Sequence, residues 1–100
     1  MIGYATIGVN DMERAKKFYS DLFADRGASV QLDAGRIAFV GTSMKEPMVA
    51  VCEPYDKNQP QPGNGTMLAF AASSKEEAAS LYAKALELVD AGYAVMIADI

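Results

Sequence analysis

A proline- and glycine-rich segment at residues 54–65 is the feature that most restricts how this chain can fold. It contains three prolines and two glycines. Proline breaks a helix interior and is excluded from central strands, and glycine weakens both kinds of element. We therefore interpret residues 54–65 as a connector. The regular elements must lie on either side of it, in residues 1–53 and 66–100 of what we expect to be a single domain.

The stretch before the connector begins with a strand and a helix. Residues 2–9 are rich in β-branched side chains, which predicts a strand. Asn10 followed by Glu13 has the spacing of a capping box, with Asn10 as the N-cap. Apolar residues then recur at helical spacing, so we expect an amphipathic helix over roughly 11–24. Gly27 is expected to end it.

Three short strands are predicted after this helix. Residues 28–33 alternate apolar and polar side chains, and residues 37–40 are continuously apolar. A short turn separates these two segments, so together they predict a hairpin. Residues 48–52 form a third apolar segment of strand length.

The stretch after the connector begins in the same way. Residues 66–72 predict a strand, and Ser73 with Glu76 repeats the capping-box spacing. A helical stripe of apolar residues continues to about residue 88 or 89, and residues 94–100 are apolar enough for a final strand. The predicted class is α+β. It consists of a βαβββ module followed by an incomplete second module, β-α-β, with a curved mixed sheet and helices on one face.

Charge and composition exclude several classes of function. Nine basic residues against 13 acidic ones give a net charge of −4, which argues against nucleic-acid binding and against docking on an anionic membrane. The chain has no histidine, which removes histidine-based catalysis and every histidine-containing metal site. Cys52 is the single cysteine, so no intramolecular disulfide can form and a reducing, cytoplasmic setting is expected.

No segment predicts export or membrane insertion. The apolar runs stop well short of the roughly 18 residues that a spanning helix requires. Residues 1–4 carry no basic side chain, so we do not expect a signal peptide there.

The opening of the chain resembles a known superfamily. Residues 2–15 read IGYATIGVNDMERA and are followed by Phe18-Tyr19. This run resembles the start of the glyoxalase, bleomycin-resistance and extradiol-dioxygenase proteins, also called vicinal oxygen chelate proteins. The resemblance continues through residues 63–70 and the helix from Ser73. It implies paired βαβββ modules and a ligand or metal held in the cup of the curved sheet.

The metal ligands of that superfamily are not found at the matching positions. The resemblance places a histidine ligand on the first strand, where this chain has Tyr4, and another after the connector, where it has Met67. An acidic ligand would fall within residues 48–52, yet the nearest acid is Glu53. A phenol and a thioether are poor ligands for a hard cation. We therefore expect no metal, no other cofactor and no catalytic residue, and we exclude metal-dependent isomerase and dioxygenase chemistry.

The second module is shorter than the resemblance implies. A complete module would need about 25–30 further residues, by comparison with the first. A shortened module would leave an open sheet edge and an uncovered apolar surface. We therefore expect a homodimer, with the C-terminal strand exchanged between subunits as one arrangement.

Candidate ligand-binding residues follow from strand alternation. Tyr4 and Thr6 share the face on which the superfamily holds its ligands. Met67 and Ala69 have the same parity on their predicted strand, and Met48 is expected beside them. Arg36 follows the hairpin turn and could hold an anionic group.

Each of these residues also has a purely structural interpretation. Tyr4 could pack at an interface, the methionines could fill gaps in a core, and Arg36 could face solvent. Cys52 is expected to be a small buried apolar residue, because no histidine is present to activate it as a nucleophile.

Three functions remain after these exclusions. The first is metal-free binding of an apolar or aromatic small molecule in the sheet cup or at a dimer interface. The bleomycin-resistance branch sequesters drugs without metal chemistry, so the resemblance permits this function. The second is a structural or assembly remnant of the family with no retained activity. The third is a metal-free enzyme that uses Tyr4 or Arg36, for which fold similarity alone gives no support.

Overall fold

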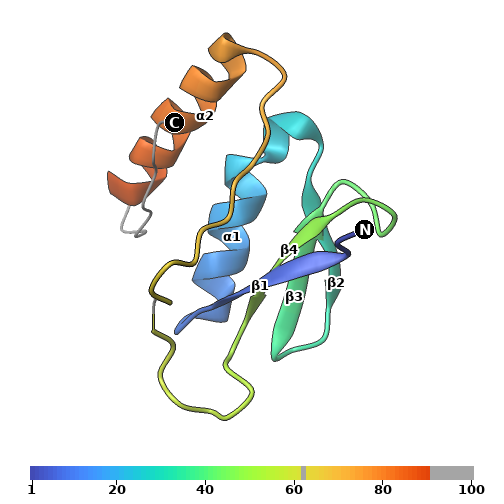
Figure 1. Cartoon of the computed structure of the whole chain (residues 1–100), viewed down its shortest axis with the longest axis vertical. Helices are drawn as coiled ribbons and strands as arrows, with labels where there is room; N and C mark the ends of the chain where they lie inside the picture. The colour runs from blue at the N-terminus through green and yellow to red at the C-terminus, as the bar shows by residue number, and fades with distance from the viewer. Residues whose placement is uncertain (62, 91–100) are drawn as a thin grey trace. The chain divides into compact units, whose positions relative to one another are not determined.

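The computed structural model describes residues 1–61 and 63–90 (Figure 1). The chain divides into two compact units, Met1–Gly63 and Asn64–Ile100, and each is considered by itself. This division falls within the predicted connector. The strand expected over 94–100, and with it any exchange of that strand, lies outside the described residues.

The first unit contains the expected βαβββ order. It comprises β1 (Tyr4–Gly8), α1 (Met12–Leu22), a 3-10 turn η1 (Ala24–Arg26), β2 (Ser29–Asp33), β3 (Ile37–Gly41) and β4 (Met48–Cys52). The strands form a four-stranded mixed sheet in the order β1-β4-β3-β2. β1 runs parallel to β4, and the other two pairs are antiparallel. The predicted α+β class and mixed sheet are confirmed.

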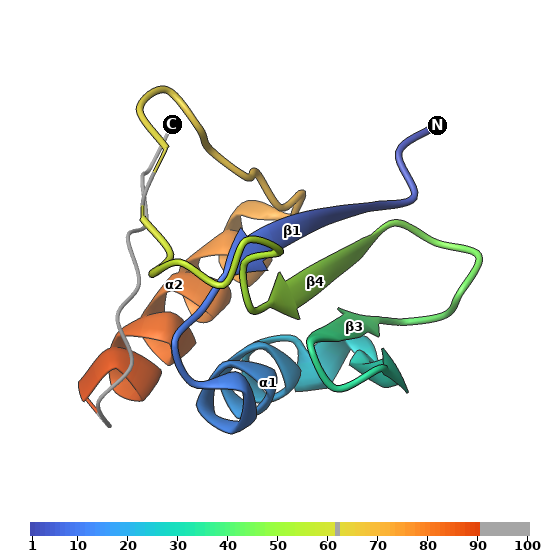
Figure 2. The same ribbon diagram turned by 90° about the horizontal axis from the view of Figure 1, so that it is seen from below.

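Helix α1 covers one face of this sheet (Figure 2). Phe18 and Leu22 are its buried residues. They lie over the sheet face whose side chains are also buried. These side chains are Ala38 and Val40 from β3, and Val49 and Val51 from β4. Val51 is fully enclosed. Alternation along each strand thus directs small and β-branched side chains toward α1, where they form the core.

The opposite sheet face carries a different set of side chains. In the parallel register, Tyr4 lies beside Met48, Thr6 beside Ala50 and Gly8 beside Cys52. Ile37 and Phe39 of β3 continue the same face, because they pair with Cys52 and Ala50. We call this surface of the first unit the open face. The predicted parity of Tyr4 and Thr6 is confirmed.

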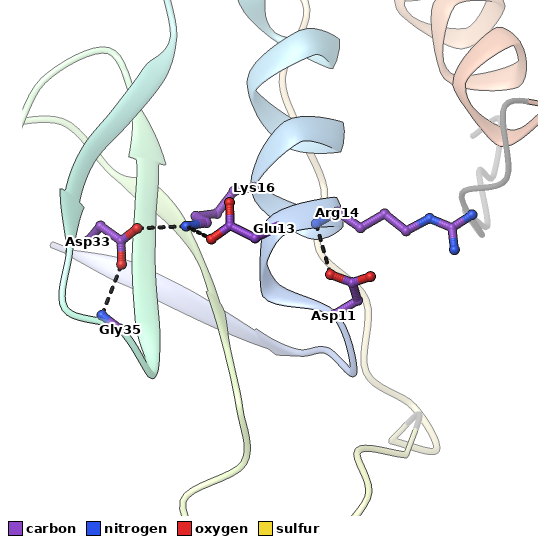
Figure 3. Close-up of polar contacts among 6 residues, drawn as sticks. All are labelled: Asp11, Glu13, Arg14, Lys16, Asp33 and Gly35. Carbon is purple, nitrogen blue, oxygen red and sulfur yellow. Dashed lines mark hydrogen bonds and ion pairs between the residues drawn. The ribbon is translucent and has the colours of Figure 1, made fainter.

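The N-terminus of α1 differs from the prediction by one residue. Asp11, not Asn10, is the N-cap, and its Oδ1 accepts a hydrogen bond from the Arg14 amide at 3.1 Å (Figure 3). The Asp11 carbonyl accepts the first helical bond, from the Ala15 amide. Asn and Asp are both suitable N-cap residue types. Asp11 takes this position because it lies three residues before the Arg14 amide, which its side chain can reach. The helix also ends earlier than predicted, at Leu22 with Phe23 as its C-cap, and Gly27 closes the following turn η1 instead, with φ of +80°.

Lys16 ties α1 to the edge of the sheet. Its Nζ lies 2.7 Å from Asp33 Oδ2 on β2 and 2.6 Å from Glu13 Oε1 (Figure 3). The hydrogen bond from Lys16 and a second one from the Gly35 amide lower the pKa of Asp33. The hydrogen bonds to Asp33 and Glu13 raise the pKa of Lys16. The ion pair therefore holds the helix against the outermost strand.

The second unit contains helix α2 (Lys75–Asp90). The strand predicted at residues 66–72 is wrong, because this segment has no regular structure. In the described chain no strand lies beside it in a sheet, so its apolar composition alone does not make it one. The helix is capped by Ser74 instead of the predicted Ser73, through a bond of 3.0 Å from the Glu77 amide to Ser74 Oγ.

Neither described helix combines the length with the apolar character that crossing a bilayer requires.

Candidate functional site

The open face leads into a hollow of about 500 Å³ at the ends of β1 and β4. The sheet contributes Tyr4, Thr6, Gly8, Ile37 and Cys52 to its lining. The loop that follows β4 contributes the other wall, including Pro54, Tyr55, Asp56, Asn58 and Pro60. The hollow is wide open to solvent, and polar and apolar side chains contribute to its lining in similar measure.

Two aromatic rings meet on the open face beside this hollow. Tyr4 on β1 and Phe39 on β3 pack edge to face across β4, with ring centroids 4.8 Å apart. Ala50 of β4 lies in register between β1 and β3 and is fully buried. Tyr4 itself remains 49% exposed. The small side chain of Ala50 thus allows the aromatic pair to form, and one of the rings stays accessible to a ligand.

Arg36 reaches the hollow from the turn before β3. Its NH1 group donates a hydrogen bond of 2.8 Å to the Glu53 carbonyl, and its guanidinium carbon lies 5.5 Å from the centre of the Tyr55 ring. The Glu53 amide donates in return to the Arg36 carbonyl at 2.8 Å. These contacts fix a cation at the boundary between sheet and loop.

The loop after β4 is folded by its own polar groups. Asp56 accepts two hydrogen bonds from Asn58, one from the backbone amide at 2.9 Å and one from the side-chain amide at 3.1 Å. Lys57 between them has a φ of +65°. Its amide donates to the Pro54 carbonyl at 2.9 Å. A lysine in the left-handed region is strained, and the Asp56–Asn58 contacts help to hold this turn.

A close approach of Pro60 sets the position of this loop against β1. A side chain at Gly8 would place its Cβ 3.0 Å from Pro60 Cβ. Glycine at this position therefore allows the loop to lie against the end of β1, where it forms one side of the hollow.

The structure brings together three of the six predicted ligand-binding residues. Tyr4, Thr6 and Arg36 line the hollow. Met48 shares the open face but is buried, and its side chain packs over Gly41, where an added Cβ would lie 2.6 Å from Met48 Cγ. Its position is that of a core residue on this face.

Met67 and Ala69 belong to the second unit. They lie in the segment that forms no strand, so strand alternation does not place them on a common sheet face. Both are exposed. Their role in binding stays a prediction.

The loop after β4 contributes to the hollow in a way that the predicted connector did not include. Tyr55, Asp56 and Asn58 were assigned only to a connector, yet they line the hollow. The Asp-Lys-Asn sequence is a signal that could have indicated a structured turn, because Asp and Asn side chains bond to backbone two residues away. Phe39 was also missed, because its pairing with Tyr4 depends on sheet order.

The donor groups at this site do not fit a divalent metal. Within residues 1–61 and 63–90, no three His, Cys, Asp or Glu side chains are grouped as metal ligands would be. Glu53, the nearest acid to the expected ligand position, contributes its backbone to the contact with Arg36. Tyr4 engages its ring with Phe39. No metal-dependent step is derived from these residues.

The first unit is an α+β arrangement in which helix α1 covers one face of a mixed sheet. The crystal structure of a glyoxalase/bleomycin resistance protein from Albidiferax ferrireducens T118 matches this chain with a TM-score of 0.75. The two sequences are 28% identical, and the match covers 87% of this chain and 68% of that chain. This similarity confirms the resemblance to the glyoxalase/bleomycin resistance superfamily. Comparison with protein-family models and with curated protein sequences gives no match.

Proposed function

We propose that this protein binds an apolar or aromatic small molecule in the hollow of the open face without a metal ion. The observation that carries the proposal is the convergence of Tyr4, Thr6 and Arg36 with the structured loop around one hollow. Burial of apolar surface against these walls supplies affinity, and the polar groups orient the ligand. Because the donor set does not suit a divalent cation, the proposed mechanism is binding alone.

A screen of aromatic fragments by two-dimensional amide NMR tests this function. The chain is labelled with nitrogen-15 and kept in excess chelator throughout. Binding in the hollow should shift the amide signals of Thr6, Gly8 and Cys52 with saturation. The signals of α1 residues, such as Lys17, should stay in place. Shifts that appear only when the screen is repeated with a divalent metal in place of the chelator would contradict the proposal.

A matched pair of variants locates the binding site. Thr6→Val is nearly isosteric, lies in the hollow and removes one hydroxyl. Ser43→Val removes a hydroxyl outside the lining of this hollow. We expect fragment affinity to change in the first variant and to stay constant in the second. Equal affinities in both variants would place the ligand elsewhere.

The second candidate function is assembly through the same face, in line with the homodimer expected from the sequence. Exposed apolar side chains favour it, since Tyr4 is 49% and Leu32 48% exposed in the single chain. Sedimentation of the purified protein at micromolar concentration distinguishes the two functions. A dimer that Tyr4→Asp dissociates, together with no fragment binding, supports assembly. A monomer that binds fragments supports ligand binding alone.

We propose a cytoplasmic location and, on charge grounds, no nucleic-acid or membrane partner. The support is its single cysteine and its net charge of −4.

A further inference from the structure

The guanidinium of Arg36 is held in place before any ligand binds. Its NH1 group is hydrogen-bonded to the Glu53 carbonyl at 2.8 Å, and its planar head lies beside the Tyr55 ring. The backbone of Arg36 is paired with that of Glu53 as well. An arginine fixed in this way loses less conformational entropy when a ligand binds than a free one does.

Most of the hydrogen-bonding capacity of this guanidinium is not used by the described residues. An arginine side chain has five N–H donors, and the contact with Glu53 engages NH1 alone. No carboxylate in the described part of the chain forms an ion pair with Arg36, whereas Lys16 and Lys17 both have acidic partners. A planar fork of free donors matches the geometry of a carboxylate.

The hollow that Arg36 lines also contains an acidic side chain. Asp56 is the one acidic side chain among the described residues that line the hollow. Both of its oxygens accept hydrogen bonds from Asn58. These contacts orient Asp56 within its own turn, and among the described ion pairs none joins it to Arg36.

Aromatic surfaces lie on both sides of the hollow. Tyr55, on the loop, is 87% exposed, and Tyr4, on the sheet, is 49% exposed. Aromatic rings bind planar ligands through offset or edge-to-face contacts. The hollow therefore offers a place for a ring and, at its rim, a place for a negative charge.

We infer that the hollow selects planar aromatic ligands that carry a carboxylate, with the carboxylate on Arg36 and the ring between Tyr4 and Tyr55. This inference rests on the proposed function and specifies the class of ligand. It assigns Arg36 as the residue that determines charge specificity.

The test compares two probes that differ in charge and share a shape, 4-hydroxybenzoate and 4-hydroxybenzamide. Dissociation constants are measured by amide NMR titration at low ionic strength, on the full chain. The carboxylate should bind about tenfold more tightly than the amide, the factor expected for one partly exposed charge-assisted contact. The preference should shrink in 1 M salt, which screens exposed charges.

Two charge-matched variants distinguish a local contact from an effect of net charge. Arg36→Gln should abolish the preference for the carboxylate. Arg26→Gln removes the same charge from η1, whose arginine lies over Phe23 and does not line the hollow, and should leave the preference intact. Asp56→Asn, which removes the acid from the hollow, should strengthen carboxylate binding a few-fold.

The outcomes separate this inference from the proposed function. Equal binding of both probes to the unmodified chain overturns the inference and leaves the proposed function standing. A carboxylate preference that survives in Arg36→Gln, or disappears equally in Arg26→Gln, also overturns it. No binding of either probe overturns the inference and counts against the proposed function itself.

Discussion

The two faces of the four-stranded sheet are built from the same strands and serve different purposes. On the face toward α1, Ala38 and Val51 are fully buried beneath Phe18 and its neighbours. On the open face, Tyr4 is half-exposed and Phe39 is partly so. One residue along a strand is enough to move a side chain from one face to the other.

The difference indicates where stability resides in this fold and where the proposed binding would take place. The covered face has close-packed aliphatic side chains, whose burial stabilises the folded state. The open face has aromatic rings and polar groups, which lose less by remaining in water and can contact a ligand. Substitutions on the covered face should therefore affect unfolding, and substitutions on the open face should affect binding more than unfolding.

The largest effect is expected from truncating matched phenylalanines on the two faces. Phe18→Ala leaves a cavity under α1 and should reduce the free energy of unfolding by about 3–5 kcal/mol. Phe39→Ala removes a partly exposed ring and its contact with Tyr4, for a loss of about 1 kcal/mol. Urea titration followed by circular dichroism measures both. Equal losses would mean that the open face is as much a part of the core as the covered one.

A smaller loss is expected where the open face is tightly packed. Gly41→Ala would place a methyl group 2.6 Å from Met48 Cγ, so Met48 must move at a cost of about 1–2 kcal/mol. Gly3→Ala is the control, since nothing lies within 4 Å of a Cβ at that position. The combination of Gly41→Ala with Met48→Ala should cost less than the sum of the two. Additivity in this double-mutant cycle would refute the packing contact.

The helix that covers one face depends on its N-cap. Asp11→Ala removes the hydrogen bond to the Arg14 amide and should cost about 1 kcal/mol of stability. Asn10→Ala, one residue earlier, should cost little. The same urea titrations compare the two variants. If Asn10→Ala is the more damaging change, the capping-box interpretation of the sequence is right and the structural assignment is wrong.

The smallest effect is expected from pH acting on the tie between α1 and β2. The pKa of Asp33 is lowered in the folded state. Its contribution to the free energy of unfolding is therefore complete above the usual pKa of 3.8, and it is lost as the pH falls through the lower pKa of the folded state. Since the pKa of Lys16 is raised, its contribution is complete below 10.5 and is lost as the pH rises through the higher, folded-state value. As the pH is lowered, the free energy of unfolding should fall less steeply in Asp33→Asn than in the unmodified chain. Identical acid limbs would show that the ion pair contributes nothing to stability.

Much of the first unit could be predicted from the sequence. Helical spacing located α1, and the apolar run at 48–52 located β4 with its observed bounds. Alternation placed Tyr4 and Thr6 on the correct face, because strand parity is a local property. The predicted N-cap was wrong by one residue because Asn and Asp are equally suitable residue types at this position. Only the folded backbone determines whether the side chain of Asn10 or of Asp11 reaches the amide.

The features that could not be predicted are those that depend on contacts between distant residues. Residues 66–72 have strand composition, yet a strand requires a partner, and composition does not specify one. The contact between Arg36 and Glu53 joins two turns, so neither turn reveals it alone. For the same reason the loop wall of the hollow, with Tyr55 and Asp56, was not foreseen.

Native mass spectrometry of the gently purified full chain tests the central claim most directly, because it detects bound metal, retained ligand and the number of subunits together. The account predicts an added mass that corresponds to an organic molecule and no stoichiometric metal. The added mass should be lost when the protein is denatured, and chelator should leave it unchanged. A stoichiometric divalent metal that chelator removes together with the ligand would contradict the account.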